Sequence, residues 1–226
     1  MIGKLYLIAT PIGNLEDITL RALAVLKQVD LLLCEDTRVT RRLLERHGLE
    51  VKTESYREQV HGRQLGKVLE RLRDGEQVGL VSDAGTPGVS DPGSLLVRDL
   101  LAAEPELEIV PVPGPSASVA AISVAGFPAA AFTFLGFPPH KKGRTAFFRE
   151  ALDYPHPVVL YESPHRIEKA LELLSELDSD RRMCLLRELT KVHETVYRGT
   201  PGEILAGLAA TSTRGEFVLV IDGKKK

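Results

Sequence analysis

Short apolar runs alternate with amphipathic segments along the whole chain, and this alternation predicts both strands and helices. Short apolar runs bounded by glycine, proline or charged residues are typical of buried strands. The predicted strands are residues 4–9, 31–34, 78–81, 109–112, 132–135, 158–161, 184–187, 193–198 and 216–221. Between them, apolar residues recur every three or four positions, which indicates helices with one buried face. Three such faces consist of Ile18, Ala22, Val25 and Val29, of Leu65, Val68, Leu69 and Leu72, and of Ile167, Leu171, Leu174 and Leu177.

The alternation of strands and helices favours an α/β fold with largely parallel sheets. A proline-rich segment at residues 111–115 interrupts the pattern near the midpoint and predicts a boundary between two domains. We expect an N-terminal α/β domain over residues 1–114 with a mostly parallel sheet, and a C-terminal α/β domain over residues 115–226. The last two predicted strands flank one short helical segment, so the sheet of the second domain is expected to be mixed.

Polar residues follow the predicted strands at the points where the strands end. They occupy residues 10–14, 35–38, 82–83 and 113–116 in the first half, and residues 162–166 and 187–191 in the second. Because the carboxyl ends of parallel strands lie at one edge of a sheet, we expect these residues to gather at one edge of each sheet. Two such edges facing each other would form a cleft lined by carboxylates, arginines and free backbone amides.

The loop Ser-Asp-Ala-Gly-Thr-Pro-Gly-Val-Ser-Asp-Pro-Gly at residues 82–93 is the strongest single indication of a binding site. It follows an apolar strand directly and carries Asp83 among small residues. Glycine and proline make such a loop tight and let a ligand approach its backbone closely. We expect a helix after the loop, with Asp91 as its capping residue and Pro92 at its first position.

Composition and missing motifs narrow the class of function. The chain of 226 residues is 43% apolar and 27% charged, enough for a substantial core, and its formal net charge of −2 gives no overall nucleic-acid signal. No apolar run approaches the roughly 20 residues that span a bilayer, and no signal peptide is recognisable, so we expect a soluble cytoplasmic protein. Cys34 and Cys184 end apolar runs, which favours buried free thiols over a disulfide or a metal site. The motifs of NAD-, ATP- and zinc-dependent enzymes and of serine hydrolases are missing.

Several motifs together resemble one family over nearly the whole chain. The segments Thr10-Pro-Ile-Gly-Asn-Leu-Glu-Asp-Ile-Thr-Leu-Arg-Ala22 and Cys34-Glu-Asp-Thr-Arg38 resemble the opening of the tetrapyrrole methylases, and within them the small-subunit ribosomal RNA cytidine 2′-O-methyltransferases. The remaining motifs of that subgroup are similar to residues 82–93, Pro113-Gly-Pro-Ser-Ala117, Leu135-Gly-Phe-Pro-Pro139, Tyr161-Glu-Ser-Pro-His-Arg166 and Arg187-Glu-Leu-Thr-Lys191. Longer members of the subgroup carry an extra C-terminal segment, whereas here only a lysine-rich tail follows Asp222.

The resemblance implies two tetrapyrrole-methylase-like α/β domains with S-adenosyl-L-methionine bound in the cleft between them. It also implies methyl transfer to the ribose 2′-hydroxyl of a cytidine in the decoding region of 16S ribosomal RNA, so that the small ribosomal subunit is the partner. The usual assembly of the family is a homodimer. Neither a metal nor a membrane is expected.

The chemistry of this methyl donor indicates which residues of the first domain would hold it. Its carboxylate suits free backbone amides at a helix start, which Ser116 and Ala117 would provide. Carbonyl and amide groups around Asp83, Gly85 and Thr86 could hold its methionine or adenosine part. In the alternative interpretation, Asp83 is a loop residue that satisfies nearby amides.

The resemblance adds further residues to the expected cofactor site. Pro11 and Pro87 belong to the loops already described, and Tyr161 and Leu189 match cofactor positions on the second domain. Tyr161 is equally consistent with a simple place in the core.

Methyl transfer needs an in-line approach of the hydroxyl oxygen to the methyl group, and a base that takes the hydroxyl proton would accelerate it. The candidate bases, all at predicted strand ends, are Glu35, Asp36, Glu162 and Glu188. Arg38 or Arg166 could stabilise a developing alkoxide or hold the adjacent phosphate. In the alternative interpretation, these residues form structural ion pairs between domains or subunits.

Two clusters of positive charge could contact RNA. Arg38, Arg41, Arg42 and Arg46 recur at helical spacing, and a second cluster spans residues 140–149 with phenylalanines interleaved. The candidate substrate-binding residues are Arg38, Arg41, Lys141, Lys142, Arg144 and Arg166. Each cluster could instead be an ordinary solvated face.

Two other functions remain open. One is a sister methyltransferase that acts on a porphyrinoid or on a modified histidine. The basic segment at residues 140–149 and the small, non-aromatic residues of the loop at 82–93 disfavour the porphyrinoid. The other is a non-catalytic ribosome-assembly factor that senses S-adenosyl-L-methionine, which the charged clusters at the strand ends disfavour.

Overall fold

A computed structural model describes residues 2–57, 59, 61–91 and 93–224. The chain divides into two compact units, Met1–Ser116 and Ala117–Lys226. The division lies two residues after the boundary expected from the sequence, because the helix that follows the proline-rich segment begins at Ala117 and packs in the second unit.

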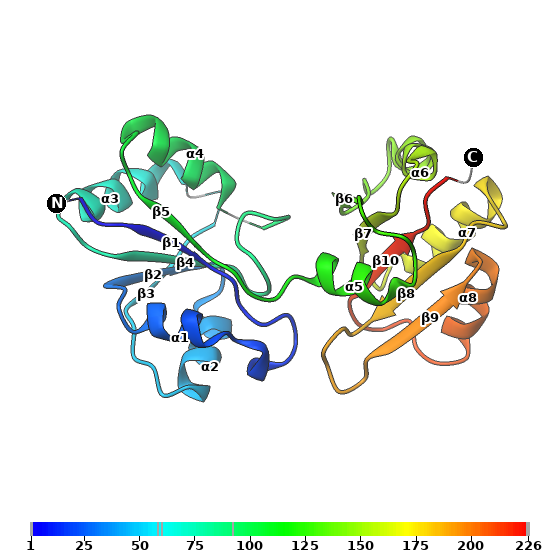
Figure 1. The fold of residues 1–226 in the computed structure, drawn as a ribbon, viewed down its shortest axis with the longest axis horizontal. Helices are drawn as coiled ribbons and strands as arrows, with labels where there is room; N and C mark the ends of the chain where they lie inside the picture. Colours follow the sequence, from blue (N-terminus) through cyan, green and yellow to red (C-terminus); the bar gives the residue numbers. More distant parts are fainter. Residues whose placement is uncertain (1, 58, 60, 92, 225–226) are drawn as a thin grey trace. The chain divides into compact units, whose positions relative to one another are not determined.

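The first unit is a parallel sheet covered by helices on both faces (Figure 1). Its strands are β1 (Leu5–Ile8), β2 (Leu31–Cys34), β3 (Thr53–Ser55), β4 (Val78–Val81) and β5 (Ile109–Val112). They lie in the order β3-β2-β4-β1-β5, and every pairing is parallel. Helices α1 (Leu20–Leu26) and α2 (Thr37–Arg46) cover one face, α3 (His61–Arg73) and α4 (Ser94–Ala103) cover the other, and a short 3₁₀ turn η1 (Leu15–Asp17) precedes α1.

The apolar runs of the first unit are continuous because both faces of the sheet are buried. Within β2, Leu31 and Leu33 pack against α3 and α4, while Leu32 and Cys34 pack against α1 and α2. Cys34 and, in the second unit, Cys184 are buried free thiols, as expected from the sequence.

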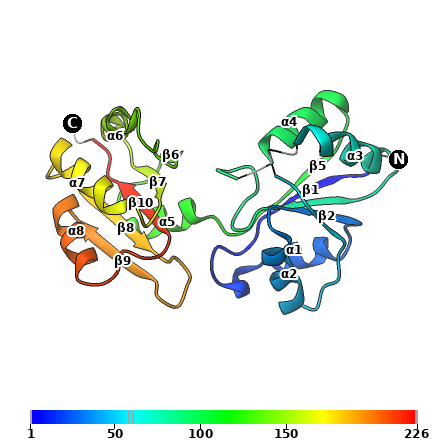
Figure 2. The same cartoon turned by 180° about the vertical axis from the view of Figure 1, so that it is seen from behind.

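The second unit is a mixed sheet with one helix on one face and three on the other (Figure 2). Its strands are β6 (Thr133–Gly136), β7 (Val158–Glu162), β8 (Met183–Arg187), β9 (Thr195–Gly199) and β10 (Phe217–Ile221), in the order β6-β7-β10-β8-β9. Strands β6 and β7 are parallel, β10 is antiparallel to β7 and β8, and β9 is antiparallel to β8. Helix α5 (Ala117–Ala125) covers one face, and α6 (Arg144–Asp153), α7 (Ile167–Leu177) and α8 (Pro201–Ala209) cover the other.

The predicted α/β fold with one parallel and one mixed sheet is confirmed. One strand, β3, was missed because it is short, polar and at the edge of its sheet, so that no apolar run marks it. The predicted capping role of Asp91 was wrong. Helix α4 begins at Ser94 with Gly93 as its N-cap and no side-chain cap, because the loop makes further turns before the helix starts. Pro92 lies outside the described residues.

Candidate functional site

The carboxyl ends of the strands in the first unit lie at a single edge of the sheet. Cys34 pairs with Val81 across β2 and β4, and Ile8 pairs with Val112 across β1 and β5. The segments that follow these strands therefore begin side by side, and they contain the first four polar segments identified in the sequence.

Backbone groups of the loops after β1 and β4 are joined directly. The Thr10 N–H donates to the Gly85 carbonyl at 2.9 Å, and the Gly85 N–H donates to the Thr10 carbonyl at 3.1 Å. The buried Thr10 hydroxyl also donates to the Ser82 carbonyl at 3.1 Å. Gly85 has a φ of +81°, a conformation that favours glycine. A side chain at position 85 would therefore strain the backbone of this loop.

The loop after β5 approaches the same place. The Thr86 hydroxyl lies 3.5 Å from the Pro115 carbonyl. A Cβ on Gly114 would lie 3.0 Å from the Cβ of Ala9, closer than ordinary van der Waals contact. Three loops thus meet through backbone and small side chains. We call the segments 10–11, 82–87 and 113–116 the glycine-lined rim.

Asp83 connects the glycine-lined rim to the end of β2. Its Oδ1 accepts a hydrogen bond from the Asp36 N–H at 3.0 Å. Burial raises the pKa of Asp83 above its ordinary value, and the negative charge of Asp36 adds to this. A small cavity of about 40 Å³ beside it is lined in part by Thr10, Pro11 and Ser82. Asp83 thus accepts a hydrogen bond from a nearby amide, as in the alternative interpretation, and it also lines a cavity.

The other expected cofactor residues of this region occupy different environments. Pro11, Gly85 and Pro87 are buried, whereas Ser116 and Ala117 are partly exposed at the start of α5.

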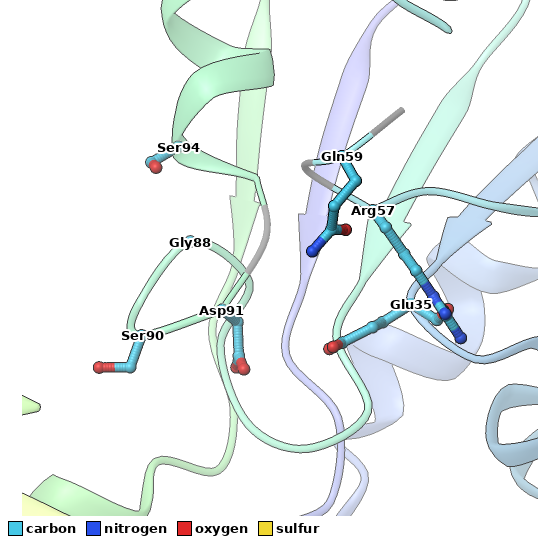
Figure 3. A pocket seen from close by; sticks show the side chains of 7 residues that line it. All are labelled: Glu35, Arg57, Gln59, Gly88, Ser90, Asp91 and Ser94. Atoms are coloured by element: carbon cyan, nitrogen blue, oxygen red, sulfur yellow. The ribbon is translucent and has the colours of Figure 1, made fainter. Parts of the chain in front are cut away.

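A larger cavity of about 530 Å³ opens at the same edge of the first sheet. It is lined by Glu35, Arg57, Gln59, Gly88, Ser90, Asp91 and Ser94 (Figure 3). The side chains of Glu35 and Asp91 point into the same space from the loops after β2 and β4, and the Gln59 amide points into it as well (Figure 3). The Arg57 Nε donates to the Glu35 carbonyl at 3.2 Å, which holds the arginine against the end of β2.

Both carboxyl groups in this cavity are harder to ionise than usual. Burial raises the pKa of Asp91 to about 6, and the charge of Glu35 contributes to the shift. Burial also raises the pKa of Glu35, followed by the charge of Asp83. Within the described residues Glu35 has no ion-pair partner. A carboxylate in this state can accept a proton from a bound group.

Asp36 has a different environment although it is the next residue in the chain. It is the N-cap of α2, where Oδ1 accepts from the Arg38 N–H at 2.9 Å, and Oδ2 pairs with the Arg38 guanidinium at 2.6 Å. The hydrogen bonds from Arg38 hold the pKa of Asp36 well below its usual range. Asp36 is therefore a poor proton acceptor. Its ion pair with Arg38 is local to the start of α2, unlike the pairs between domains or subunits of the alternative interpretation.

Glu162 ends β7 in the second unit, and its side chain is completely buried. Its carboxylate pairs with Arg144 at 2.5 Å and with Arg166 at 2.9 Å, and it accepts from the Ser163 N–H at 2.8 Å. A buried charge with two guanidinium partners is satisfied, and removal of one partner of a buried pair costs about 3–5 kcal/mol. We call these three residues the buried ion triad.

The buried ion triad holds the loop between β6 and α6. Arg144 donates to the Pro139 carbonyl at 3.3 Å, and Arg166 donates to the Pro138 carbonyl at 3.3 Å. The Arg144 guanidinium also lies 5.0 Å from the centre of the Phe148 ring. Arg144 and Arg166 are thus engaged by the protein itself, while Lys141 and Lys142 of the same loop are exposed.

Glu188 follows β8 and is tied to neighbouring backbone. It accepts from the Glu216 N–H at 2.9 Å and pairs with Lys191 at 3.1 Å. Burial favours a higher pKa, but these two hydrogen bonds prevail and lower the pKa of Glu188. Glu188 and Thr190 both have positive φ values, 55° and 66°, on either side of Leu189. Strained backbone of this kind often marks a functional loop.

Tyr161 lies in an aromatic group at the end of β7. Its ring centre is 4.9 Å from that of Phe134 and 5.5 Å from that of Phe137. Phe137 is 54% exposed, so the group has an accessible aromatic surface in the loop between β6 and α6, which also carries Lys141 and Lys142.

The cations of α2 are only partly available. Arg38 pairs with Asp36, and Arg46 lies 3.4 Å from Glu16. Arg41 and Arg42 are exposed and have no ion pair within the part of the chain that the structure describes.

Sequence reasoning missed three residues of the larger cavity. Arg57 and Gln59 follow the unrecognised strand β3, so the rule that polar residues follow strands was not applied there. Asp91 was assigned to a helix cap, although its place in the loop of small residues was a signal.

Across the described residues, no group of three or more potential ligand side chains could hold a metal ion. Likewise, none of the described helices has the length and apolar character needed to cross a membrane.

Two solved structures share the fold. Diphthine synthase aligns with a TM-score of 0.75 and 16% identity, covering 99% of this chain and 91% of that one. Cobalt precorrin-4 methyltransferase, a cobalamin biosynthetic enzyme, aligns with a TM-score of 0.68 and 18% identity over 97% of this chain and 94% of that one. At these identities the similarity concerns the fold alone.

Sequence comparison places the chain in a family. Residues 4–205 match the family model of the Tetrapyrrole (Corrin/Porphyrin) Methylases. A protein of Neisseria meningitidis serogroup A named ribosomal RNA small subunit methyltransferase I is 49% identical over 222 residues, which cover 97% of this chain and 76% of that protein. A protein of the same name from Thermotoga maritima is 40% identical over 223 residues and is covered completely. The chain therefore belongs to the tetrapyrrole methylase family, among relatives named ribosomal RNA small subunit methyltransferase I.

Proposed function

We propose that this protein transfers a methyl group from S-adenosyl-L-methionine to the ribose 2′-hydroxyl of a cytidine in the decoding region of 16S ribosomal RNA. The observation that carries the proposal is the 39–49% identity, over nearly the whole chain, to proteins named for methylation of small-subunit ribosomal RNA. The cytidine, the 2′-hydroxyl and the decoding region come from the motif resemblance, and the polar cavity beside the glycine-lined rim supports a nucleotide acceptor.

S-adenosyl-L-methionine is the methyl donor of this family, and the chemistry of the glycine-lined rim fits it. The donor has a positively charged sulfur and ammonium group, for which the carbonyls of this rim and Asp83 are suitable partners. Gly114 lets the loop after β5 pack closely against Ala9, and Gly85 has the positive φ that the loop after β4 requires. The donor's carboxylate suits the positive end of the dipole of α5, which begins at Ala117 directly after Ser116. When bound, the donor supplies the electrophilic methyl group.

Other expected residues remain part of the proposal. Pro11, Thr86 and Pro87 would contact the donor within the rim, and the family resemblance also assigns Tyr161 and Leu189 to donor binding.

Glu35 is the residue that the geometry favours as the general base. It is the one of the four candidate carboxylates without an ion pair or cap hydrogen bond within the described residues, and it faces a cavity of nucleotide size. Its carboxylate would take the 2′-hydroxyl proton as the oxygen attacks the methyl group. Alignment of the two reactants would accelerate the methyl transfer, and the base would accelerate it further by about 10²–10⁴-fold.

The RNA would be held by exposed cations. Lys141 and Lys142 are free to contact phosphates, and Arg41 offers a further contact on α2. Arg38 would act mainly by holding Asp36. Arg144 and Arg166 would act mainly by holding the loop between β6 and α6. The homodimer expected from the family is part of the same proposal, and light scattering of the purified protein would measure it.

The decisive experiment is incubation of the protein with labelled S-adenosyl-L-methionine and small ribosomal subunits that lack the modification. We expect label in 16S ribosomal RNA, and mass spectrometry of nuclease fragments should locate it on one cytidine ribose. A label on a base, or on another nucleotide, would contradict the proposal. Donor binding without transfer would favour the assembly-factor alternative, and transfer to a corrinoid precursor would favour the sister methyltransferase.

A further inference from the structure

The larger cavity holds more polar groups than the proposed methyl transfer uses. Its volume of about 530 Å³ lies within the range of small-molecule sites, roughly 300–1,000 Å³. Glu35 has a role as the base on one side, but Arg57, Gln59 and Asp91 have none. These three residues line the cavity without a role in the methyl transfer, which indicates that the cavity has a second function.

The residues on either side of Arg57 and Gln59 belong to a partly buried hydrogen-bond network. The hydroxyl of the fully buried Tyr56 lies 2.8 Å from Nδ1 of His61, and Nε2 of His61 lies 2.8 Å from Oδ2 of Asp99. Tyr56 precedes Arg57 directly, and His61 follows Gln59 two positions later. Connected networks of this kind favour a single local arrangement. Tyr56 and His61, which lie on either side of Arg57 and Gln59 in the chain, are therefore held in place.

A hydrogen-bond donor and an acceptor face the same cavity from different loops. Arg57 also lines the cavity, but its Nε donates to the Glu35 carbonyl, and its guanidinium points away from the space that the Gln59 and Asp91 side chains enter (Figure 3). The Gln59 side chain has no hydrogen bond within the described residues and points into the cavity (Figure 3). The Asp91 carboxyl points into it from the loop after β4 (Figure 3).

This set of groups matches one pyrimidine better than the other. Cytosine presents an amino group, which donates, next to acceptor positions, and acidic side chains typically accept from that amino group. Uracil has a carbonyl oxygen in place of the amino group, and a carboxylate would repel it.

We propose that the cavity receives the base of the acceptor nucleotide and that Asp91 selects cytosine by accepting a hydrogen bond from its exocyclic amino group. Gln59 donates to an acceptor atom of the base. The inference rests on the proposed function, since it assigns the base-reading side of the same reaction.

Asp91 has a structural contact, a hydrogen bond with Ser82. It does not cap α4, because Gly93 is the N-cap. Burial and the nearby Glu35 raise the pKa of Asp91 to about 6, and Asp83 adds to the shift while Ser82 opposes it. An acid whose pKa is higher in the folded state loses stability as pH rises from its unfolded pKa to its folded pKa. Near neutral pH the ionised Asp91 therefore destabilises the fold, which is typical of residues retained for function.

The test compares small ribosomal subunits that carry cytidine or uridine at the nucleotide methylated by the protein. For the wild type, kcat/KM should be about tenfold to a hundredfold higher for cytidine than for uridine. For Asp91→Asn, whose amide can donate as well as accept, this ratio should fall close to one. The affinity for S-adenosyl-L-methionine, measured by calorimetry, should not change. Asp74→Asn removes an exposed carboxylate elsewhere in the first unit and serves as the matched control.

Two outcomes overturn the inference while the proposed function stands. One is a wild-type protein that methylates both substrates equally well, and the other is Asp91→Asn with an unchanged cytidine preference. If the wild type methylates neither substrate, the proposed function itself fails and the inference with it.

A second measurement distinguishes a base reader from a structural residue. The melting temperature of Asp91→Asn should exceed that of the wild type at pH 7. The difference should shrink as the pH falls from about 6 to below 3.8, the ordinary pKa of aspartate, because Asp91 is then protonated in both states. A variant that is less stable than the wild type at pH 7 would indicate a structural role and contradict the inference.

Discussion

At the scale of single residues, the surroundings of each carboxylate decide what it can do. Asp36 is held by Arg38, Glu162 by Arg144 and Arg166, and Glu188 by Lys191. Glu35 lies in a cavity, and burial raises its pKa. Identical chemical groups at similar strand ends thus have different protonation behaviour, because an opposite charge favours ionisation and burial disfavours it.

Glu35→Gln should lower kcat by about 10²–10⁴-fold, because the amide cannot take the hydroxyl proton. Donor affinity should stay unchanged in calorimetry. The base must be ionised to act. The kcat/KM of the wild type should therefore increase with pH around an apparent pKa above 4.5, the ordinary value for glutamate. This acidic limb of the pH profile should disappear in the variant.

Glu106→Gln, an exposed carboxylate in the first unit, provides the control for the Glu35 experiment. A Glu35→Gln protein with wild-type kcat, or one that keeps the acidic limb of its pH profile, would exclude Glu35 as the base.

At the scale of elements, the loop between β6 and α6 combines a rigid base with an exposed tip. The buried ion triad binds the carbonyls of Pro138 and Pro139, while Lys141 and Lys142 remain exposed. The loop therefore presents its positive charges without using them internally. This suits a contact with phosphates, whose strength depends on released counterions.

The double variant Lys141→Ala and Lys142→Ala should bind small ribosomal subunits more weakly. The slope of log affinity against log salt concentration should fall by about two, one for each lost phosphate contact. Donor affinity should not change. Filter binding at several salt concentrations measures this effect.

Lys67→Ala with Lys169→Ala removes two exposed charges from α3 and α7 and serves as the matched control. Equal salt dependence for both double variants would show that the loop is an ordinary solvated surface.

The elements also show where sequence patterns are informative. Strands with continuous apolar runs, such as β2 and β4, were recognised because both faces of their sheet are buried. Strand β3 has three residues, none of them apolar, and its pairing with β2 depends on distant parts of the chain. The start of α4 was misplaced because a loop with several positive-φ residues can continue past an aspartate and a proline that would otherwise begin a helix.

At the scale of the whole molecule, each unit has its own core, and the glycine-lined rim lies within the first. A ligand that binds the folded protein and not the unfolded chain stabilises it by an amount set by its concentration. Binding of the donor is therefore measurable without any RNA.

S-adenosyl-L-methionine at a hundred times its Kd should raise the free energy of unfolding by about 2.7 kcal/mol, provided that unfolding is cooperative. The melting temperature should increase with donor concentration in calorimetry. NAD and ATP, for which the chain has no motifs, should leave it unchanged. Stabilisation by NAD or ATP but not by the donor would contradict the cofactor assignment.

The sequence by itself determined the α/β class, the two sheets, most element positions and the family, because burial periodicity and loop motifs are local properties of the chain. Only the tertiary structure decided which charges are paired and which face a cavity. Arg144 and Arg166 meet Glu162, and Arg57, Gln59 and Asp91 meet Glu35, through strand order and loop paths. The protonation and availability of a side chain depend on neighbours distant in sequence, and no local pattern encodes them.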